Sequence, residues 1–173
     1  MPIVYDKSRK IFHLQAGDTS YIMQIVKEKY LVHLYWGRRI SSYHESRRII
    51  WKDRGFAPNP DTSDRTFSLD TLPQEYPQTG NGDFRNPAYG IRQENGSRIS
   101  NLEYIGYEIS DGKPKLPGLP ASSGSKKDVQ TLKVYMEDAV AGLNVCLLYS
   151  VFASESVITR SVIFLNKGKS RCI

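Results

Sequence analysis

The residues best equipped for chemistry lie in one long stretch, residues 53–87, which we call the arm. The arm has no helical or strand period, and it mixes prolines and glycines with aromatic, acidic and arginine side chains. Arginine and aspartate offer charge-assisted hydrogen bonds, and phenylalanine and tyrosine offer flat apolar faces. A loop this long is uncommon in a compact domain unless it has a function, and this mixture suits contact with a polyhydroxylated partner. The alternative is a rigid structural connector whose charges pair with one another.

Other kinds of site find little support. His13, His33 and His44 lie far apart, and no pair of cysteines or histidines has metal-ligand spacing. The chain contains no Gly-x-Ser-x-Gly elbow. The segment Gly168-Lys-Ser170 imitates the end of a phosphate-binding loop, but Ile163 stands where the first glycine should be. We therefore expect no metal and no cofactor.

The elements that must position these residues read as β-strands separated by turns. Residues 19–26 and 30–36 are two β-rich runs joined by a short polar turn. Residues 88–94 and 98–107 flank Asn95-Gly96, a strong signal for a β-hairpin. At most one or two helical turns are expected, over residues 41–50.

The second half of the chain carries the clearest strands. Residues 131–137 alternate apolar and polar side chains, which predicts a strand with one wet face. Residues 143–152 are apolar on both faces and should form a central strand, and residues 157–165 form another. A linker rich in Gly, Pro, Ser and Lys spans residues 111–127. Many short strands with such turns predict an all-β, antiparallel sandwich.

The end of the chain is unusual for a sandwich. After residues 157–165 comes a plausible turn at 166–170, and a turn should lead into a returning strand. A sandwich without its later strands would expose sheet edges and apolar faces. The alternative is a complete small sandwich with a frayed tail.

Charge and hydropathy limit the partners. The net charge is +6, with basic residues clustered at positions 38–54 near Trp36 and Trp51. Acidic residues are nevertheless interspersed along the chain, and no nucleic-acid-binding signature is present, so we expect no nucleic-acid partner. No apolar run approaches the roughly 18 residues of a membrane span. The start shows no secretory signal, and Cys146 and Cys172 make no disulfide framework, so we expect a cytoplasmic protein.

Several motifs resemble a known family. Leu72-Pro-Gln-Glu-Tyr-Pro77, followed by Asp83-Phe-Arg-Asn-Pro-Ala88, is similar to the N-terminal region of bacterial α-galactosidases of glycoside hydrolase family 36. The similarity covers nearly the whole chain. It continues through residues 35–37, 58–60, 64–68, 112–121 and 157–161.

The resemblance implies a fold and a parent reaction. The family's N-terminal domain is a large β-supersandwich, so residues 1–173 would be one such domain, truncated at its C-terminus. Family members are several times longer, and their catalytic carboxylates lie in a later (β/α)8 barrel that is absent here. The parent would hydrolyse terminal α-galactosyl groups of melibiose- or raffinose-like sugars with retention and without a cofactor. This part would be structural and oligomerising, and inactive alone.

The carboxylates of the arm agree with that expectation. Retaining hydrolysis of a glycoside needs two carboxyl groups about 5–5.5 Å apart. The arm's candidates all lie in loop sequence, where no regular spacing fixes a pair, so we expect surface or capping roles and assign no catalytic residue. They are Asp61, Asp64, Asp70, Glu75 and Asp83.

The resemblance also implies two substrate-binding residues. In the family, a tetramer brings an N-terminal segment of one subunit to the active-site mouth of its neighbour. Residues 53–65 match that segment, so Asp53 would hydrogen-bond the sugar and Arg65 would hold the loop or the sugar. Trp36 and Trp51 have flat faces of the kind that stack on a pyranose, but we interpret Trp36 as a core or interface residue and not as a ligand. The alternative interpretation of the whole chain is a free-standing carbohydrate-binding module.

Overall fold

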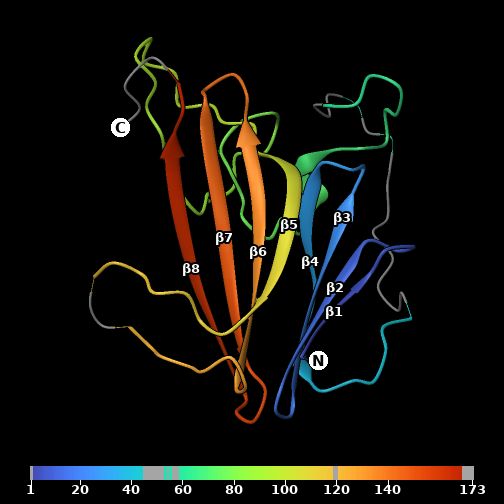
Figure 1. The fold of residues 1–173 in the computed structure, drawn as a ribbon. Helices are drawn as coiled ribbons and strands as arrows, with labels where there is room; N and C mark the ends of the chain where they lie inside the picture. The colour runs from blue at the N-terminus through green and yellow to red at the C-terminus, as the bar shows by residue number, and fades with distance from the viewer. Residues whose placement is uncertain (1, 45–52, 54, 56–58, 119–120, 169–173) are drawn as a thin grey trace.

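The computed structural model describes residues 2–44, 53, 55, 59–118 and 121–168. Two antiparallel sheets of four strands each pack face to face, in the orders β1-β2-β3-β4 and β5-β6-β7-β8 (Figure 1). This confirms the expected all-β antiparallel sandwich. The first sheet comprises β1 (Ile3–Asp6), β2 (Ile11–Ala16), β3 (Thr19–Val26) and β4 (Tyr30–Arg38). The second comprises β5 (Glu103–Asp111), β6 (Val129–Asp138), β7 (Leu143–Phe152) and β8 (Val157–Asn166).

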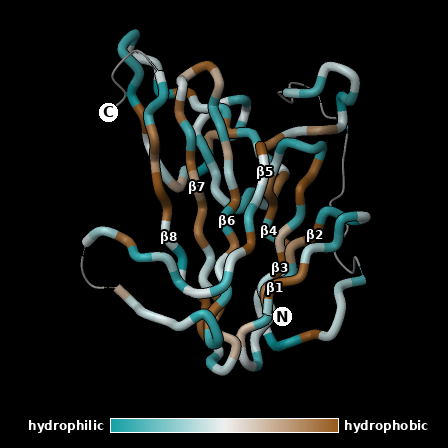
Figure 2. The backbone as a smooth tube through the Cα atoms, in the orientation of Figure 1, coloured by the Kyte–Doolittle hydropathy of each residue, from teal (hydrophilic) through white to brown (hydrophobic). Residues whose placement is uncertain are grey.

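The main core lies between the two sheets. Phe12, Leu14 and Met23 of the first sheet pack in one cluster with Leu132 and Leu147 of the second. Side chains alternate between the faces of a strand, so Leu132, Val134 and Met136 of β6 face inward while Lys133 and Glu137 are partly exposed on the other face. In Figure 2 the hydrophobic positions of the backbone concentrate in the strands of both sheets.

The first sheet is also covered on its outer face. Ile22 and Val32 point away from the main core and pack in a second cluster with Phe67, Leu69 and Leu72 of the arm. The arm therefore acts as a third layer over this sheet, which explains why β2 and β3 are buried on both faces. Leu69–Thr71 forms a single turn of 3-10 helix, η1, within this layer.

Most strand predictions are confirmed. The expected strands at 19–26 and 30–36 appear as β3 and β4, and the turn between them places Lys27 and Glu28 at φ 51° and 62°. A turn with positive φ at two consecutive residues matches the right-handed twist of the flanking strands. The three later strands appear as β6, β7 and β8, with β7 central, as its two apolar faces predict.

Two strand predictions were wrong or incomplete. Residues 88–94 form no strand, and the strand expected at 98–107 begins only at Glu103. The Asn95-Gly96 turn exists, closed by the bond from Gln93 N to Ser97 O, but its flanks do not extend into a ladder. Strands β1 and β2 were not predicted. Of the helical turns expected at 41–50, residues 45–50 lie outside the described residues.

Candidate functional site

The arm is anchored to the first sheet by backbone hydrogen bonds as well as by packing. His33 N donates to Pro73 O at 2.8 Å, and Glu75 N donates to Leu31 O at 3.0 Å. The arm thereby pairs with β4, which would otherwise present an open sheet edge. Unpaired edges promote association between chains. One function of the arm is thus to close the first sheet.

The inner part of the arm is a rigid connector whose charges pair with each other. Asp83 is fully buried, and Arg85 donates to both of its oxygens, from Nε at 2.8 Å and from Nη2 at 2.6 Å. Arg85 Nη2 also donates to the carbonyl of Leu72 at 2.8 Å, and Gln74 donates to Asp83 at 2.7 Å. Burial opposes ionisation of Asp83, but the bonds from Arg85 outweigh it, and the pKa of this carboxyl is lowered.

Two further carboxylates of the arm cap local turns. Asp61 accepts from Ser63 N at 3.0 Å, and Asp64 accepts from Thr66 N at 3.0 Å. Lys27 reaches both carboxylates, at 3.1 and 2.8 Å. Its hydrogen bond, with that of Thr66, lowers the pKa of Asp64 to about 2. These residues have the capping role expected of them.

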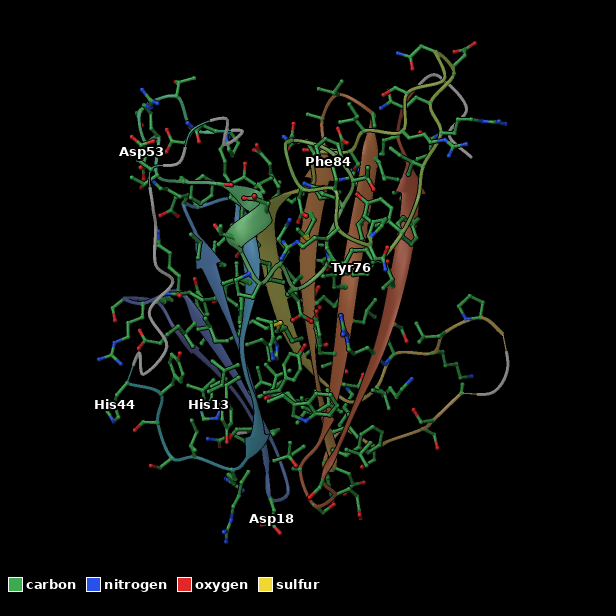
Figure 3. All side chains as sticks on the ribbon, turned by 180° about the vertical axis from the view of Figure 1, so that it is seen from behind. His13, Asp18, His44, Asp53, Tyr76 and Phe84 are labelled. Carbon is green, nitrogen blue, oxygen red and sulfur yellow. The ribbon has the colours of Figure 1, made fainter. Side chains whose placement is uncertain are left out.

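Asp53 and Arg65 lie beside each other at the outer end of the arm. Arg65 Nη2 is 3.8 Å from Asp53 Oδ1, and the two side chains are 74% and 58% exposed. Figure 3 shows Asp53 among loops that stand away from the sheets. The structure therefore brings the two predicted site residues together, and most of their hydrogen-bonding groups face solvent.

A second polar cluster, which sequence reasoning missed, surrounds Glu75. Its carboxylate is buried, with a side chain only 1% exposed, so it is neither a surface nor a capping residue as expected. Tyr21 donates to its two oxygens at 2.7 and 2.8 Å, and Tyr149 donates to Oε1 at 2.8 Å. Arg160 Nη2 lies 3.0 Å from Oε1, and His33 Nδ1 lies 3.5 Å from Oε2.

The elements that build this cluster come from the whole domain. Tyr21 is on β3, His33 on β4, Tyr149 on β7, Arg160 on β8, and Glu75 is on the arm. Burial raises the pKa of both tyrosines above the usual value, and the charge of Glu75 adds to the shift. Both hydroxyls therefore stay protonated and act as donors to the carboxylate.

A cavity of about 530 Å³ opens at this cluster, between the two sheets and the arm. We call it the inter-sheet cleft. Trp36 lines it and is 73% exposed, so of the two places expected for it, core or interface, the core is wrong and the interface stays a prediction. No single stretch of sequence could have predicted the cleft. The only signals were one glutamate, Glu75, within the proline-rich arm and one arginine, Arg160, within an apolar strand.

The remaining candidates have ordinary structural places. His13 is buried on β2, and its Nε2 lies 2.8 Å from the hydroxyl of Ser20. His44 is exposed and lies 2.7 Å from the hydroxyl of Ser42. Cys146 is a free thiol on β7, and its burial raises its pKa. Trp51 and Cys172 lie outside the described residues.

The described part of the chain holds neither a candidate metal cluster nor a candidate membrane-spanning helix. No three or more His, Cys, Asp or Glu side chains there lie in a group that could hold a metal ion. The same residues contain no helix that is long and apolar enough to cross a membrane.

Comparison with known proteins agrees with the fold and with the arm's motifs. The family model described as the glycosyl hydrolase family 36 N-terminal domain matches residues 29–173. The chain is 48% identical over 172 residues to alpha-galactosidase AgaA of Geobacillus stearothermophilus, covering 99% of the chain and 24% of that protein. It is 44% identical over 170 residues to the bifunctional alpha-galactosidase/sucrose kinase AgaSK of Mediterraneibacter gnavus, covering 97% of the chain and 18% of that protein.

Solved structures give the same result. The crystal structure of the GH36 alpha-galactosidase AgaB of Geobacillus stearothermophilus superposes with a TM-score of 0.91 at 47% identity, covering 99% of this chain and 23% of that one. AgaA A355E D548N in complex with raffinose superposes with a TM-score of 0.88 at 49% identity, covering 94% of this chain and 23% of that one. The chain spans about a fifth to a quarter of the length of these relatives.

Proposed function

This chain belongs to glycosyl hydrolase family 36, and we propose that it forms the N-terminal part of an α-galactosidase that hydrolyses terminal α-galactosides with retention. The observation that carries the proposal is the similarity along almost the entire chain to alpha-galactosidase AgaA. Substrates such as melibiose and raffinose would be bound by the full-length enzyme only. The proposed reaction needs no cofactor.

Within that enzyme the chain has a structural and oligomerising role. We infer that residues 1–173 are part of a larger β-supersandwich, and that the enzyme is a cytoplasmic homotetramer. The exposed apolar side chains Ile163, Phe164 and Leu165 on β8, the edge strand of the second sheet, support a role in association. Apolar side chains gathered at an open sheet edge are typical of a surface that packs against further protein.

We further propose that the outer end of the arm serves the active site of a neighbouring subunit. Asp53 and Arg65 are held together, yet each remains largely exposed. The inner part of the arm is fixed by the ion pair of the buried Asp83 with the half-exposed Arg85 and by packing on the first sheet. A rigid base with an exposed carboxylate and guanidinium at its end suits a polar segment that hydrogen-bonds a sugar of another subunit.

The chain alone should be inactive, because the proposed nucleophile and acid/base lie in the later barrel. Four carboxylates of the arm are already engaged in caps or ion pairs, namely Asp61, Asp64, Glu75 and Asp83. The test is release of nitrophenol from a nitrophenyl α-galactoside by the purified chain, compared with a mock purification. We expect no difference. Activity above the mock preparation that Asp64→Asn or Asp53→Asn abolishes would contradict the proposal.

A further inference from the structure

The inter-sheet cleft has the size and construction of a small-molecule site. Its volume of about 530 Å³ falls within the roughly 300–1,000 Å³ that is typical of ligand pockets. Its walls come from β3, β4, β7, β8 and the arm, so it is shaped by the fold and not by one loop. The backbone pairing of the arm with β4 holds one wall in place.

The charge inside the cleft is balanced. Glu75 supplies one negative charge, and Arg160 at 3.0 Å supplies one positive charge. Tyr21 and Tyr149 use their hydroxyls as donors to the same carboxylate. Glu75 would repel an anionic ligand, and Arg160 would repel a cationic one. Neither ligand would find an unpaired charge of opposite sign, because Glu75 and Arg160 pair with each other. An uncharged ligand is therefore favoured.

The mouth of the cleft offers an aromatic face beside polar groups. The Trp36 ring is 73% exposed and meets the Tyr21 ring edge-on, with 6.1 Å between the centroids. Thr19 and Ser156 also line the cleft and carry hydroxyls, and Ile158 adds apolar surface. Indole combines a flat apolar face with an N–H donor, which suits partners that have one apolar face and a polar edge.

We propose that the inter-sheet cleft binds a neutral saccharide ring, with Trp36 as the stacking face and the hydroxyl groups of the lining as hydrogen-bond partners. A pyranose has an apolar face of C–H groups and a rim of hydroxyls, and it carries no charge. The site lies within this domain and is distinct from Asp53 and Arg65, which do not line the cleft. The inference does not depend on the reaction of the proposed parent enzyme.

The test uses the purified 173-residue chain and methyl α-D-galactopyranoside and methyl α-D-glucopyranoside as neutral probes, with galacturonate and galactosamine as charged ones. The chain contains two tryptophans, so its nuclear magnetic resonance spectrum has two indole N–H signals, and Trp36→Phe assigns that of Trp36. We expect at least one neutral probe to shift the Trp36 signal in a saturable manner. Neither charged probe should bind more tightly than its neutral counterpart.

Substitutions locate the site. Isothermal titration calorimetry compares the variants, since it does not need the Trp36 signal. Trp36→Ala should weaken binding about tenfold or more, because it removes the stacking face. Phe84→Ala is the matched control, since Phe84 is 78% exposed and does not line the cleft, and it should bind like the unaltered chain. Both residues are exposed, so both variants should fold.

Three results would overturn the proposal. The first is no saturable shift with either neutral probe. The second is an equal loss of binding in the Trp36→Ala and Phe84→Ala variants. The third is binding by this chain but not by a longer enzyme of the family that carries the same cleft residues, because a protein segment would then occupy the cleft.

Discussion

The hydroxyl of Tyr149 donates a 2.8 Å hydrogen bond to Oε1 of Glu75, and so joins the second sheet to the arm that covers the first. The whole Tyr149 residue and the side chain of Glu75 are each 1% exposed, so water does not replace this bond. Arg160 stacks over the Tyr149 ring at 5.3 Å while it pairs with Glu75. One carboxylate thus connects both sheets and the arm.

The first prediction is that Glu75 is a major contributor to stability. Glu75→Ala would leave the buried hydroxyls of Tyr21 and Tyr149 without their acceptor, and each buried donor left unsatisfied costs about 1–3 kcal/mol. Tyr149→Phe removes one hydrogen bond to a charged group and should cost about 1.5–3 kcal/mol. Urea denaturation measures the free energy of unfolding of each variant.

The control for this experiment is Glu94→Ala, because Glu94 is an exposed glutamate in a turn. A surface substitution of this kind should change the free energy of unfolding by no more than about 0.5 kcal/mol. Equal effects at Glu75 and Glu94 would show that the buried cluster does not hold the layers together.

The second prediction concerns Asp53 and Arg65 in an assembled enzyme. In a full-length relative with Asp and Arg at the corresponding positions, replacing either by Ala should lower kcat/KM by roughly ten- to a hundredfold. A lost hydrogen bond to a charged group costs about 1.5–3 kcal/mol, and the loss reaches the transition state if the contact persists there. The stability of the subunit should hardly change, because an exposed ion pair contributes about 0.2–1 kcal/mol.

Mixed oligomers make this experiment sharper. A subunit with an altered arm is mixed with a subunit whose barrel is inactive. Activity should return, because an intact arm on one chain can serve an intact barrel on another. Full activity of the two Ala variants, or no rescue in oligomers shown to have mixed, would remove Asp53 and Arg65 from the site.

The third prediction is a loss of stability in acid that depends on Asp64. Its pKa is lowered from 3.8 to about 2 in the folded chain. A depressed folded pKa means that the unfolded chain takes up the proton first as the pH falls. The contribution of Asp64 is therefore complete above pH 3.8 and is lost as the pH falls to about 2.

Thermal unfolding followed between pH 5 and pH 2 checks this window. The melting temperature should fall less steeply below pH 3.8 in Asp64→Asn than in the unaltered chain. The difference should be small, because Lys27 and Asp64 form an exposed pair that solvent screens. Asp18→Asn, at an exposed aspartate in another turn, controls for the lost negative charge. The prediction fails if both variants change the slope of melting temperature against pH equally.

The fourth prediction is that the isolated chain self-associates through β8. Ile163 and Leu165 are 47% and 53% exposed on this edge strand, and they point to the same side of it. Replacing both by Lys should shift the chain toward the monomer, as measured by light scattering after size exclusion. Ile105→Lys on β5, also 53% exposed, is the matched control and should not change the mass. A sharply melting monomer at high concentration in the unaltered chain would refute the prediction.

Local pattern was enough to predict strands β3, β4, β6, β7 and β8, because each carries its own signal. The alternation of apolar and polar side chains in β6 indicates that one face is buried, and the apolar side chains on both faces of β7 indicate that both are. Neither pattern depends on which strand pairs with it. β1 was missed because it has only four residues. β2 was missed because its apolar residues face two different layers, so it shows no simple alternation. The segment at 88–94 has strand-like residues and a good turn, but no neighbouring strand pairs with it.

The sequence by itself determined the fold class, the family and the identity of the arm, because these depend on residues close together along the chain. Only the tertiary structure decided what the arm's charges do. Asp83 found its partner two residues away, whereas the hydroxyls bound to Glu75 come from residues 54 and 74 positions distant. Hydrogen bonds between residues so far apart in the sequence form only after the two sheets and the arm have packed. Glu75 and Trp36 therefore acquire their roles, and the inter-sheet cleft its walls, from packing that no local pattern records.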